Sequence, residues 1–332
     1  MTFERLTLTL ILLSVPFWPA KLNADEPLVI AHRGASGYLP EHTLEAKAMA
    51  HAMGAHYIEQ DVVLTKDDQP VVLHDIHLDT VTNVVDLFPG RAREDGRFYA
   101  IDFTLAEIKR LTATERISLR TGKAVYPTRF PAKTSSFKVP TLAEEIELSQ
   151  GLNQSTGRNA GIYPEIKAPE FHRQAGKDIS KIVLDTVQRY GYRSKEDKCF
   201  VQCFDLEETR RLREELGCEL RIVQLMAGNG YAKSSTAEGL KGIAEYADGV
   251  GPSLALIIKV DNGKSRITSF VADAHAAGLV VHPYTLRADE VPSLANSYSD
   301  FVRAVYLDAK VDGAFTDFPD QTITALELSA AN

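Results

Sequence analysis

The alternation of buried strands with helical patterns is the feature of the sequence that most constrains its fold. Eight apolar segments predict strands, at 28–33, 57–64, 161–168, 198–205, 219–226, 248–255, 279–286 and 312–319. Helical patterns lie between them, and several close on glycine, at 43–54, 178–191, 206–217 and 267–278. Repeated strand–helix units of this number favour a closed parallel barrel over an open sheet. We therefore expect an α/β fold, a (β/α)₈ TIM-type barrel.

The chain is longer than such a barrel requires. A (β/α)₈ barrel takes about 250 residues, and the sequence has 332. Proline, glycine and charged residues interrupt the alternation over 76–138. We expect this stretch to be an insertion after the second strand region, in a catalytic barrel that spans 25–332.

The N-terminus has the layout of a secretory signal peptide. One arginine is followed by an apolar stretch from Leu6 to Phe17 and by small residues at Ala20 and Ala24. We expect residues 1–24 to be removed and the product to be exported, soluble and without a stable membrane anchor. The alternative is a buried N-terminal helix.

Charge and cysteine content exclude some classes of protein. The formal net charge is −8 and no run of lysine or arginine occurs, which argues against a nucleic-acid partner. Cys199 and Cys203 lie four residues apart on one strand, roughly 13 Å, too far for a disulfide. We expect these two and Cys218 to be buried thiols with no metal role.

Polar residues sit where the predicted strands end. His32 and Arg33 end the first strand, and the carboxyl ends of barrel strands form the active-site face of this fold. Glu59 and Asp61 are two residues apart on the second strand, so both point to one face.

The third strand adds a further acidic residue. Glu165 and Lys167 again share a face. Three carboxylates in a buried place repel one another unless a cation lies between them. Oxygen ligands of this kind suit Ca²⁺ or Mg²⁺. The alternative is that Glu59 and Glu165 form salt bridges with Lys167 or Arg33.

His74 is predicted to return to the same place. A two-residue hairpin loop at Asp67–Asp68 would set residue 64 opposite 71 and Asp61 opposite His74. Two histidines can move protons on opposite sides of a reacting centre near neutral pH, while a divalent ion and cationic side chains hold an anionic substrate. The set suits phosphoryl transfer; an enolate is another oxyanion that such a site could take.

Several motifs resemble the glycerophosphodiester phosphodiesterase family, in its periplasmic bacterial branch. They are "AHRGASGYLPEHTLEA", "EQDVVLTKDDQPVVLHD", "YPEIKAP", "VQCFD", "YADGVGP", "VVHPYT" and "FTDFPD". The resemblance runs from about residue 26 to the C-terminus. It implies a (β/α)₈ barrel with a small insertion, and hydrolysis of glycerophosphodiesters such as glycerophosphocholine or glycerophosphoethanolamine to glycerol 3-phosphate and an alcohol.

The resemblance also implies a role for each matching residue. His32 and His74 become the acid–base pair, and Glu59, Asp61 and Glu165 the ligands of a metal ion, Ca²⁺ with Mg²⁺ as the alternative. Arg33 and Lys167 would bind phosphate, and Glu41 would orient His32 or the glycerol. Apart from the resemblance, Gln202, Phe204 and Gln224 end strands and could line a glycerol pocket, with barrel packing as the alternative. The branch is periplasmic, and it allows a homodimer, which the sequence does not determine.

Some residues and functions stay open at this stage. Asp317 could belong to the active-site face of the barrel or cap the last helix. His42 is expected to have a structural role. An exported anion-binding protein could use the same cations without turnover, but it would not need two histidines. A structural protein would be expected to show repeats or long apolar patches, which are absent from the sequence.

Overall fold

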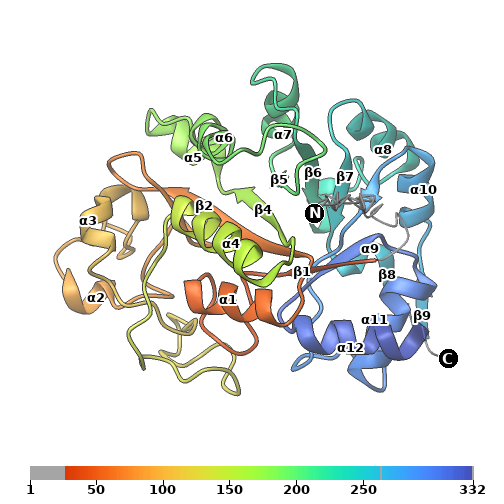
Figure 1. The fold of residues 1–332 in the computed structure, drawn as a ribbon, viewed down its shortest axis with the longest axis horizontal. Helices are drawn as coiled ribbons and strands as arrows, with labels where there is room; N and C mark the ends of the chain where they lie inside the picture. The colour runs from red at the N-terminus through yellow and green to blue at the C-terminus, as the bar shows by residue number, and fades with distance from the viewer. Residues whose placement is uncertain (1–26, 262–263, 331–332) are drawn as a thin grey trace, which may run out of the picture.

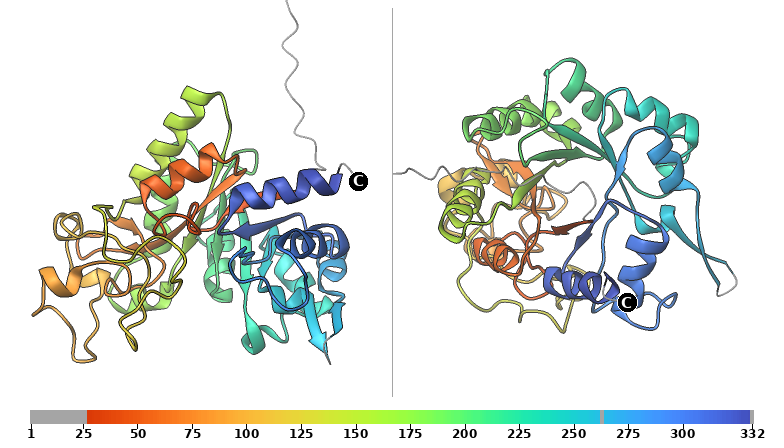
Figure 2. Two further views of the ribbon diagram at one scale, coloured as in Figure 1. Left: turned by 90° about the horizontal axis from the view of Figure 1, so that it is seen from below. Right: turned by 45° about the vertical axis from the view of Figure 1, so that its right-hand side comes forward.

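The structure, a computed structural model, describes residues 27–261 and 264–330. Within them, eight parallel strands pair in the order β10-β7-β6-β5-β4-β2-β1-β11. The backbone N–H groups of Asp312 and Phe315 donate to the carbonyl groups of Val281 and Pro283 at 3.1 and 2.9 Å, which links the two edges of the sheet. The strands form a ring with helices around it (Figure 2, right), so the predicted barrel is confirmed. The barrel strands are β1 Leu28–Ala31, β2 Tyr57–Leu64, β4 Gly161–Ile166, β5 Phe200–Cys203, β6 Arg221–Met226, β7 Gly249–Pro252, β10 Val280–Val281 and β11 Gly313–Thr316.

Helices cover the outside of the ring (Figure 1). Side-chain caps fix their starts: Thr43 accepts from the Ala46 N–H, and Thr141 with Glu144 forms a capping box. The covering helices are α1 Leu44–Ala52, α4 Leu142–Thr156, α5 Pro169–Gln174, α6 Ile179–Arg189, α7 Leu206–Glu214, α8 Ala237–Ala244, α9 Leu254–Ile257, α10 Phe270–Ala276, α11 Tyr298–Arg303 and α12 Pro319–Ala330. Within the described residues, each helix is too short or too polar to cross a membrane. The predicted signal peptide, 1–24, lies outside the described residues.

Two apolar clusters hold the barrel together. The larger lies between strands and helices, where α6, for example, buries Ile179, Val183 and Val187. The smaller lies inside the ring, where the rings of Tyr163 and Phe200 stack at a centroid distance of 4.8 Å. These inward-facing aromatic residues fill the barrel below the C-terminal ends of its strands. On β2, β4 and β5, the next inward-facing residue after this aromatic layer is polar.

The hairpin of β2 and β3 (Pro70–Val72) differs from the predicted register by one residue. Val63 pairs with Val71 and Leu64 with Pro70, so the predicted pairing of residue 64 with 71 is wrong. The loop has three residues rather than two, and Asp68 takes a left-handed φ of 59°, a conformation that such loops often use. The strand ends at Val72, so His74 reaches the mouth from the loop that follows and not from a ladder position.

Residues 76–138, the predicted insertion, lie between β3 and α4 and contain little regular structure. Their elements are α2 Val84–Leu87, a 3₁₀ turn at Ala100–Asp102 and α3 Leu105–Ile108. Figure 1 shows α2 and α3 beside the barrel, next to β2. A separate cluster holds them there, in which Phe103, Ile108 and Leu111 pack with Val63 and Val71 of the hairpin. A second hairpin, β8 Ile258–Asp261 and β9 Lys264–Ile267, extends from the opposite half of the ring.

Candidate active site

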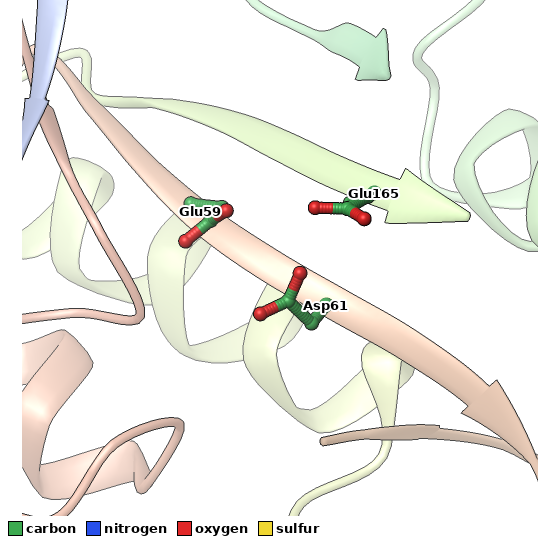
Figure 3. Close-up of side chains that lie close together, drawn as sticks. All are labelled: Glu59, Asp61 and Glu165. Carbon is green, nitrogen blue, oxygen red and sulfur yellow. The ribbon is translucent and has the colours of Figure 1, made fainter. Parts of the chain in front are cut away.

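Three carboxylates converge at the C-terminal ends of neighbouring strands. Glu59 and Asp61 lie on β2 and Glu165 on β4, and in the strand register Asp61 pairs with Glu165. One carboxylate oxygen from each lies within 4.8 Å of the others, and all three residues are buried. Figure 3 shows the three carboxyl groups close together, two from one strand and one from the next. The period-two alternation of strands explains the arrangement.

The electrostatics of these carboxylates fit a bound cation. Burial and the neighbouring Asp61 raise the pKa of Glu59 well above its ordinary value, and burial raises that of Glu165 to about 8. Burial would also raise the pKa of Asp61, but Lys167 and His42 hold it well below its ordinary value. Within the described part of the chain, Asp61 Oδ1 and Gln202 Oε1 are buried without a hydrogen-bond partner. A divalent ion would reduce the repulsion among the carboxylates and would bind oxygens that lack a hydrogen bond.

Neighbouring side chains and a backbone group fix these carboxylates. His42 Nε2 lies 2.7 Å from Asp61 Oδ2, and Lys47 Nζ lies 3.2 Å from the other nitrogen of that imidazole. Gln202 on β5 donates to Glu59 at 3.3 Å, and the Arg33 N–H donates to the same carboxylate at 2.7 Å. His42, expected to be structural, therefore touches a predicted metal ligand directly.

The turn after β1 brings Arg33 to the carboxylates. Arg33 takes a φ of 60° and Gly34 one of 86°, both in the left-handed region. A Cβ on Gly34 would lie 2.8 Å from the carbonyl carbon of Ala46 in α1, so only glycine fits there. The Arg33 guanidinium lies 3.0 Å from Glu41 and 3.4 Å from Asp61. The unusual backbone of Arg33 aims both its N–H and its side chain into the site.

Lys167 lies among the predicted metal ligands. Its Nζ is 2.6 Å from Glu165 Oε1 and 3.6 Å from Asp61 Oδ1. The salt bridge named above as the alternative for Glu165 is thus present. Lys167 contacts only two of the three carboxylates, however, and within the described residues Asp61 Oδ1 has no hydrogen bond. The salt bridge with Lys167 therefore does not satisfy all the oxygens of the cluster.

Each predicted catalytic histidine has a carboxylate on its Nδ1. His32 Nδ1 lies 2.6 Å from Asp317 Oδ1, with side chains only 10% and 2% exposed. His74 Nδ1 lies 2.7 Å from Asp75 Oδ1, with side chains 33% and 28% exposed. Burial and the nearby Arg33 lower the pKa of His32 to about 4, and the same two causes lower that of His74. The Nε2 atoms are left as the nitrogens that can exchange protons with a substrate.

A cavity of about 280 Å³ joins these groups. His32, His74 and Arg33 line one part of it together with the three carboxylates. Phe204, Leu225 and Tyr284 contribute an apolar wall. The volume suits a small molecule that has an anionic centre and a short carbon chain.

The comparisons with known proteins agree with this geometry. A profile of the glycerophosphoryl diester phosphodiesterase family matches residues 32–321. A Haemophilus influenzae glycerophosphodiester phosphodiesterase is 41% identical over 91% of this chain and 90% of its own. A Treponema pallidum protein of the same name is 37% identical over 90% and 91%. The chain belongs to the glycerophosphoryl diester phosphodiesterase family. The predicted family and enzyme class are thereby confirmed.

Solved structures share the barrel. A Silicibacter pomeroyi protein, described as a candidate glycerophosphoryl diester phosphodiesterase, superposes with a TM-score of 0.70 at 25% identity, over 91% of this chain and 94% of that one. An Oleispira antarctica phosphodiesterase, solved in complex with sn-glycerol-3-phosphate, gives 0.63 at 21% identity, over 91% and 97%.

In this phosphodiesterase the cavity gathers most of the predicted site residues, but not all of them. Those that line it are His32, Arg33, Glu59, Asp61, His74, Glu165, Gln202 and Phe204. Glu41 lies behind the cavity, where Arg33 and Arg116 bind both its oxygens. Gln224 donates to backbone carbonyl groups and is a packing residue.

Sequence reasoning missed the groups that hold the histidines. They are Asp75, Arg116, Arg129 and Arg287, and Asp317 was left undecided. Asp75 directly follows His74, which is a weak signal. The two insertion arginines carry none, because no motif surrounds them.

Proposed function

We propose that this phosphodiesterase hydrolyses glycerophosphodiesters, such as glycerophosphocholine and glycerophosphoethanolamine, to glycerol 3-phosphate and an alcohol. The observation that carries the proposal is the meeting of three buried carboxylates and two carboxylate-paired histidines at one cavity. The names of the relatives support the same substrate class.

A divalent ion, Ca²⁺ in our proposal, would be held by Glu59, Asp61 and Glu165. When bound, it neutralises charge on the phosphate oxygens and polarises the phosphorus. Arg33 would bind a further phosphate oxygen, because its guanidinium lines the cavity beside the carboxylates. Lys167 would supply a second positive charge at the same phosphate, and Glu41 would hold Arg33 in place.

The two histidines would act on opposite oxygens of the phosphate. His32, whose Nδ1 hydrogen bonds with Asp317, would accept the proton of the attacking oxygen on Nε2. His74, whose side chain is more exposed than that of His32, would donate a proton to the departing alcohol. The attacking oxygen comes from water or from the 2-hydroxyl of the glycerol. The apolar wall at Phe204 would face the carbon chain of the glycerol, and Gln202 its hydroxyl groups.

The deciding experiment measures glycerol 3-phosphate released from glycerophosphocholine, with and without a chelator. We expect activity that is lost on chelation, restored best by Ca²⁺, and absent from His32→Ala and His74→Ala. A cyclic glycerol phosphate among the products would identify attack by the 2-hydroxyl. Activity that survives chelation would remove the metal from the proposal, and activity in both histidine variants would remove the acid–base pair.

Export is a separate part of the proposal. The apolar stretch from Leu6 to Phe17 and the small residue at Ala24 support a cleaved leader and a periplasmic enzyme. Sequencing the N-terminus of the protein recovered from cells tests it. A mature protein that begins at Asp25 is expected, and a chain that retains residues 1–24 would contradict export.

A further inference from the structure

The segment between β3 and α4 contacts loops at the C-terminal ends of the barrel strands, called here the mouth of the barrel, through two arginines. Arg129 and Arg116 both come from 76–138, and their side chains are only 4% and 16% exposed. Neither lines the main cavity. Each binds a carboxylate that lies next to one of the two cavity histidines.

Arg129 joins the insertion to three loops of the barrel. Its Nη2 donates to Asp317 Oδ2 at 2.8 Å, and its Nε and Nη2 donate to Asp289 at 2.8 and 3.0 Å. Its Nη1 donates to the Ser36 carbonyl at 3.3 Å. The Tyr126 ring lies 3.7 Å from the guanidinium carbon and covers one face. The guanidinium is therefore held by four groups in one orientation.

Arg116 binds the carboxylate partner of the second histidine, as Arg129 binds that of the first. Its Nη1 lies 2.5 Å from Asp75 Oδ2, and its Nη2 and Nε donate to the two oxygens of Glu41 at 2.6 and 3.0 Å. Asp75 in turn meets His74, and Glu41 meets Arg33. One insertion residue thus touches the partners of two cavity residues.

The two arginines help to keep the carboxylates ionised. Burial would raise the pKa of Asp317, but His32, Arg287 and Arg129 together hold it below the ordinary value. Burial opposes ionisation of Asp75 as well, and His74 and Arg116 overcome it. An ionised carboxylate accepts the Nδ1 proton of an imidazole. At His32 this fixes the neutral tautomer whose Nε2 can accept a proton, and at His74 it stabilises the imidazolium whose Nε2 proton is donated.

We propose, on the basis of the function proposed above, that the insertion is part of the catalytic centre: Arg129 and Arg116 are positioning residues for His32 and His74. Each acts through one carboxylate and touches neither phosphate nor ion. The insertion therefore completes the acid–base pair in addition to its packing against the β2–β3 hairpin.

The experiment compares Arg129→Ala and Arg129→Lys with a matched control. Arg97→Ala removes an equally bidentate insertion pair, with Asp79 at 2.7 and 2.8 Å, in which Arg97 hydrogen bonds with neither Asp317 nor Asp75. We expect Arg129→Ala to lower kcat by about 10–100-fold with KM changed by less than about 3-fold. Arg129→Lys should recover part of kcat because it restores the charge, and it covers the case in which the alanine variant does not fold. Arg97→Ala should keep the parental kcat.

Arg116 provides an internal contrast. Arg116→Lys is expected to lower kcat and also to raise KM, because Glu41 would hold Arg33 less firmly. The same pattern in Arg129→Lys would contradict separate roles for the two arginines.

A spectroscopic readout separates this inference from the proposed function. The Nδ1 proton of His32, assigned by its absence from Asp317→Asn, should give a downfield NMR signal that moves or is lost in Arg129→Ala and stays in Arg97→Ala. An unchanged signal with an unchanged kcat would overturn the inference. If the parent enzyme released no glycerol 3-phosphate, the proposed function would fail, and the NMR comparison would still decide whether Arg129 positions His32.

Discussion

The two walls of the active-site mouth are built in different ways. On the wall formed by β2 and β4, strand register brings Glu59, Asp61 and Glu165 to one point. On the other wall, loops carry the histidines, which are held by Asp317 and Asp75, and arginines of the insertion bind these two carboxylates. A strand fixes a side chain through the backbone, whereas a loop needs a charged partner to do so. Substitutions on the two walls should therefore fail differently.

The largest effect is expected on the strand wall. Glu165→Gln keeps the shape of the side chain but removes one negative charge that would bind the ion. We expect kcat/KM to fall by about 10⁴-fold or more, a loss of about 5.5 kcal/mol of transition-state stabilisation. Because the backbone position is fixed by the strand, the fold should be retained.

Thermal unfolding with and without Ca²⁺ provides the independent measurement. Calcium at a hundred times its Kd should stabilise the parent by about 2.7 kcal/mol, and Glu165→Gln should lose that increment. Glu170→Gln, on the exposed side of α5, is the control and should behave as the parent. A variant that retains both activity and the calcium-dependent rise in Tm would show that the strand wall does not bind an ion.

On the loop wall, Asp317→Asn should have the next largest effect. The amide can donate to His32 Nδ1 and so favour the tautomer whose Nε2 carries the proton, which cannot act as a base. We expect kcat to fall on the order of 10³-fold, with KM little changed. Steady-state kinetics checks this. A large rise in KM with an unchanged kcat would mean that Asp317 serves substrate binding instead.

Asp75→Asn tests the more exposed half of the same wall. Its side chain is 28% exposed, and water can replace part of the hydrogen bonding that it provides to His74. We expect a fall of only about 10–100-fold in kcat. If Asp75→Asn lowered kcat as much as Asp317→Asn, burial would not determine how much each histidine–carboxylate pair contributes to kcat.

The same contrast explains what the sequence could predict. Glu59, Asp61 and Glu165 follow from period-two alternation, which is a local rule, and from the barrel fold, which sets the C-terminal ends of its strands at one face. His32 follows from its place at a strand end. Partners such as Asp317, 285 positions from His32, meet only in the folded chain. No spacing rule reaches that far.

The hairpin and the insertion mark two further limits of sequence reasoning. Asp67–Asp68 matched a two-residue loop, but the left-handed φ of Asp68 favoured a three-residue loop and shifted the register by one. Arg129 lies in a segment without periodicity, so neither its burial nor its partners could be inferred. His42 was expected to have a structural role, but its contact with Asp61 could not be inferred from the sequence.

The smallest expected effect concerns stability in the insertion itself. Glu115 is buried there, and within the described residues its Oε2 has no hydrogen-bond partner. Burial raises its pKa from 4.5 to about 7, although the Arg116 N–H donates to its other oxygen at 3.1 Å. The folded protein therefore binds a proton that the unfolded chain releases between these two pH values. The resulting stabilisation is complete below pH 4.5 and is lost as the pH rises through 7.

Glu115→Gln should remove this dependence, because the amide stays neutral. We expect the free energy of unfolding of the variant to match the parent at pH 5 and to exceed it at pH 8 by roughly 1–3 kcal/mol. Urea unfolding at the two pH values measures the difference, with the exposed Glu94→Gln as the control. An equal change at both pH values would show that Glu115 is ionised and paired in the folded state.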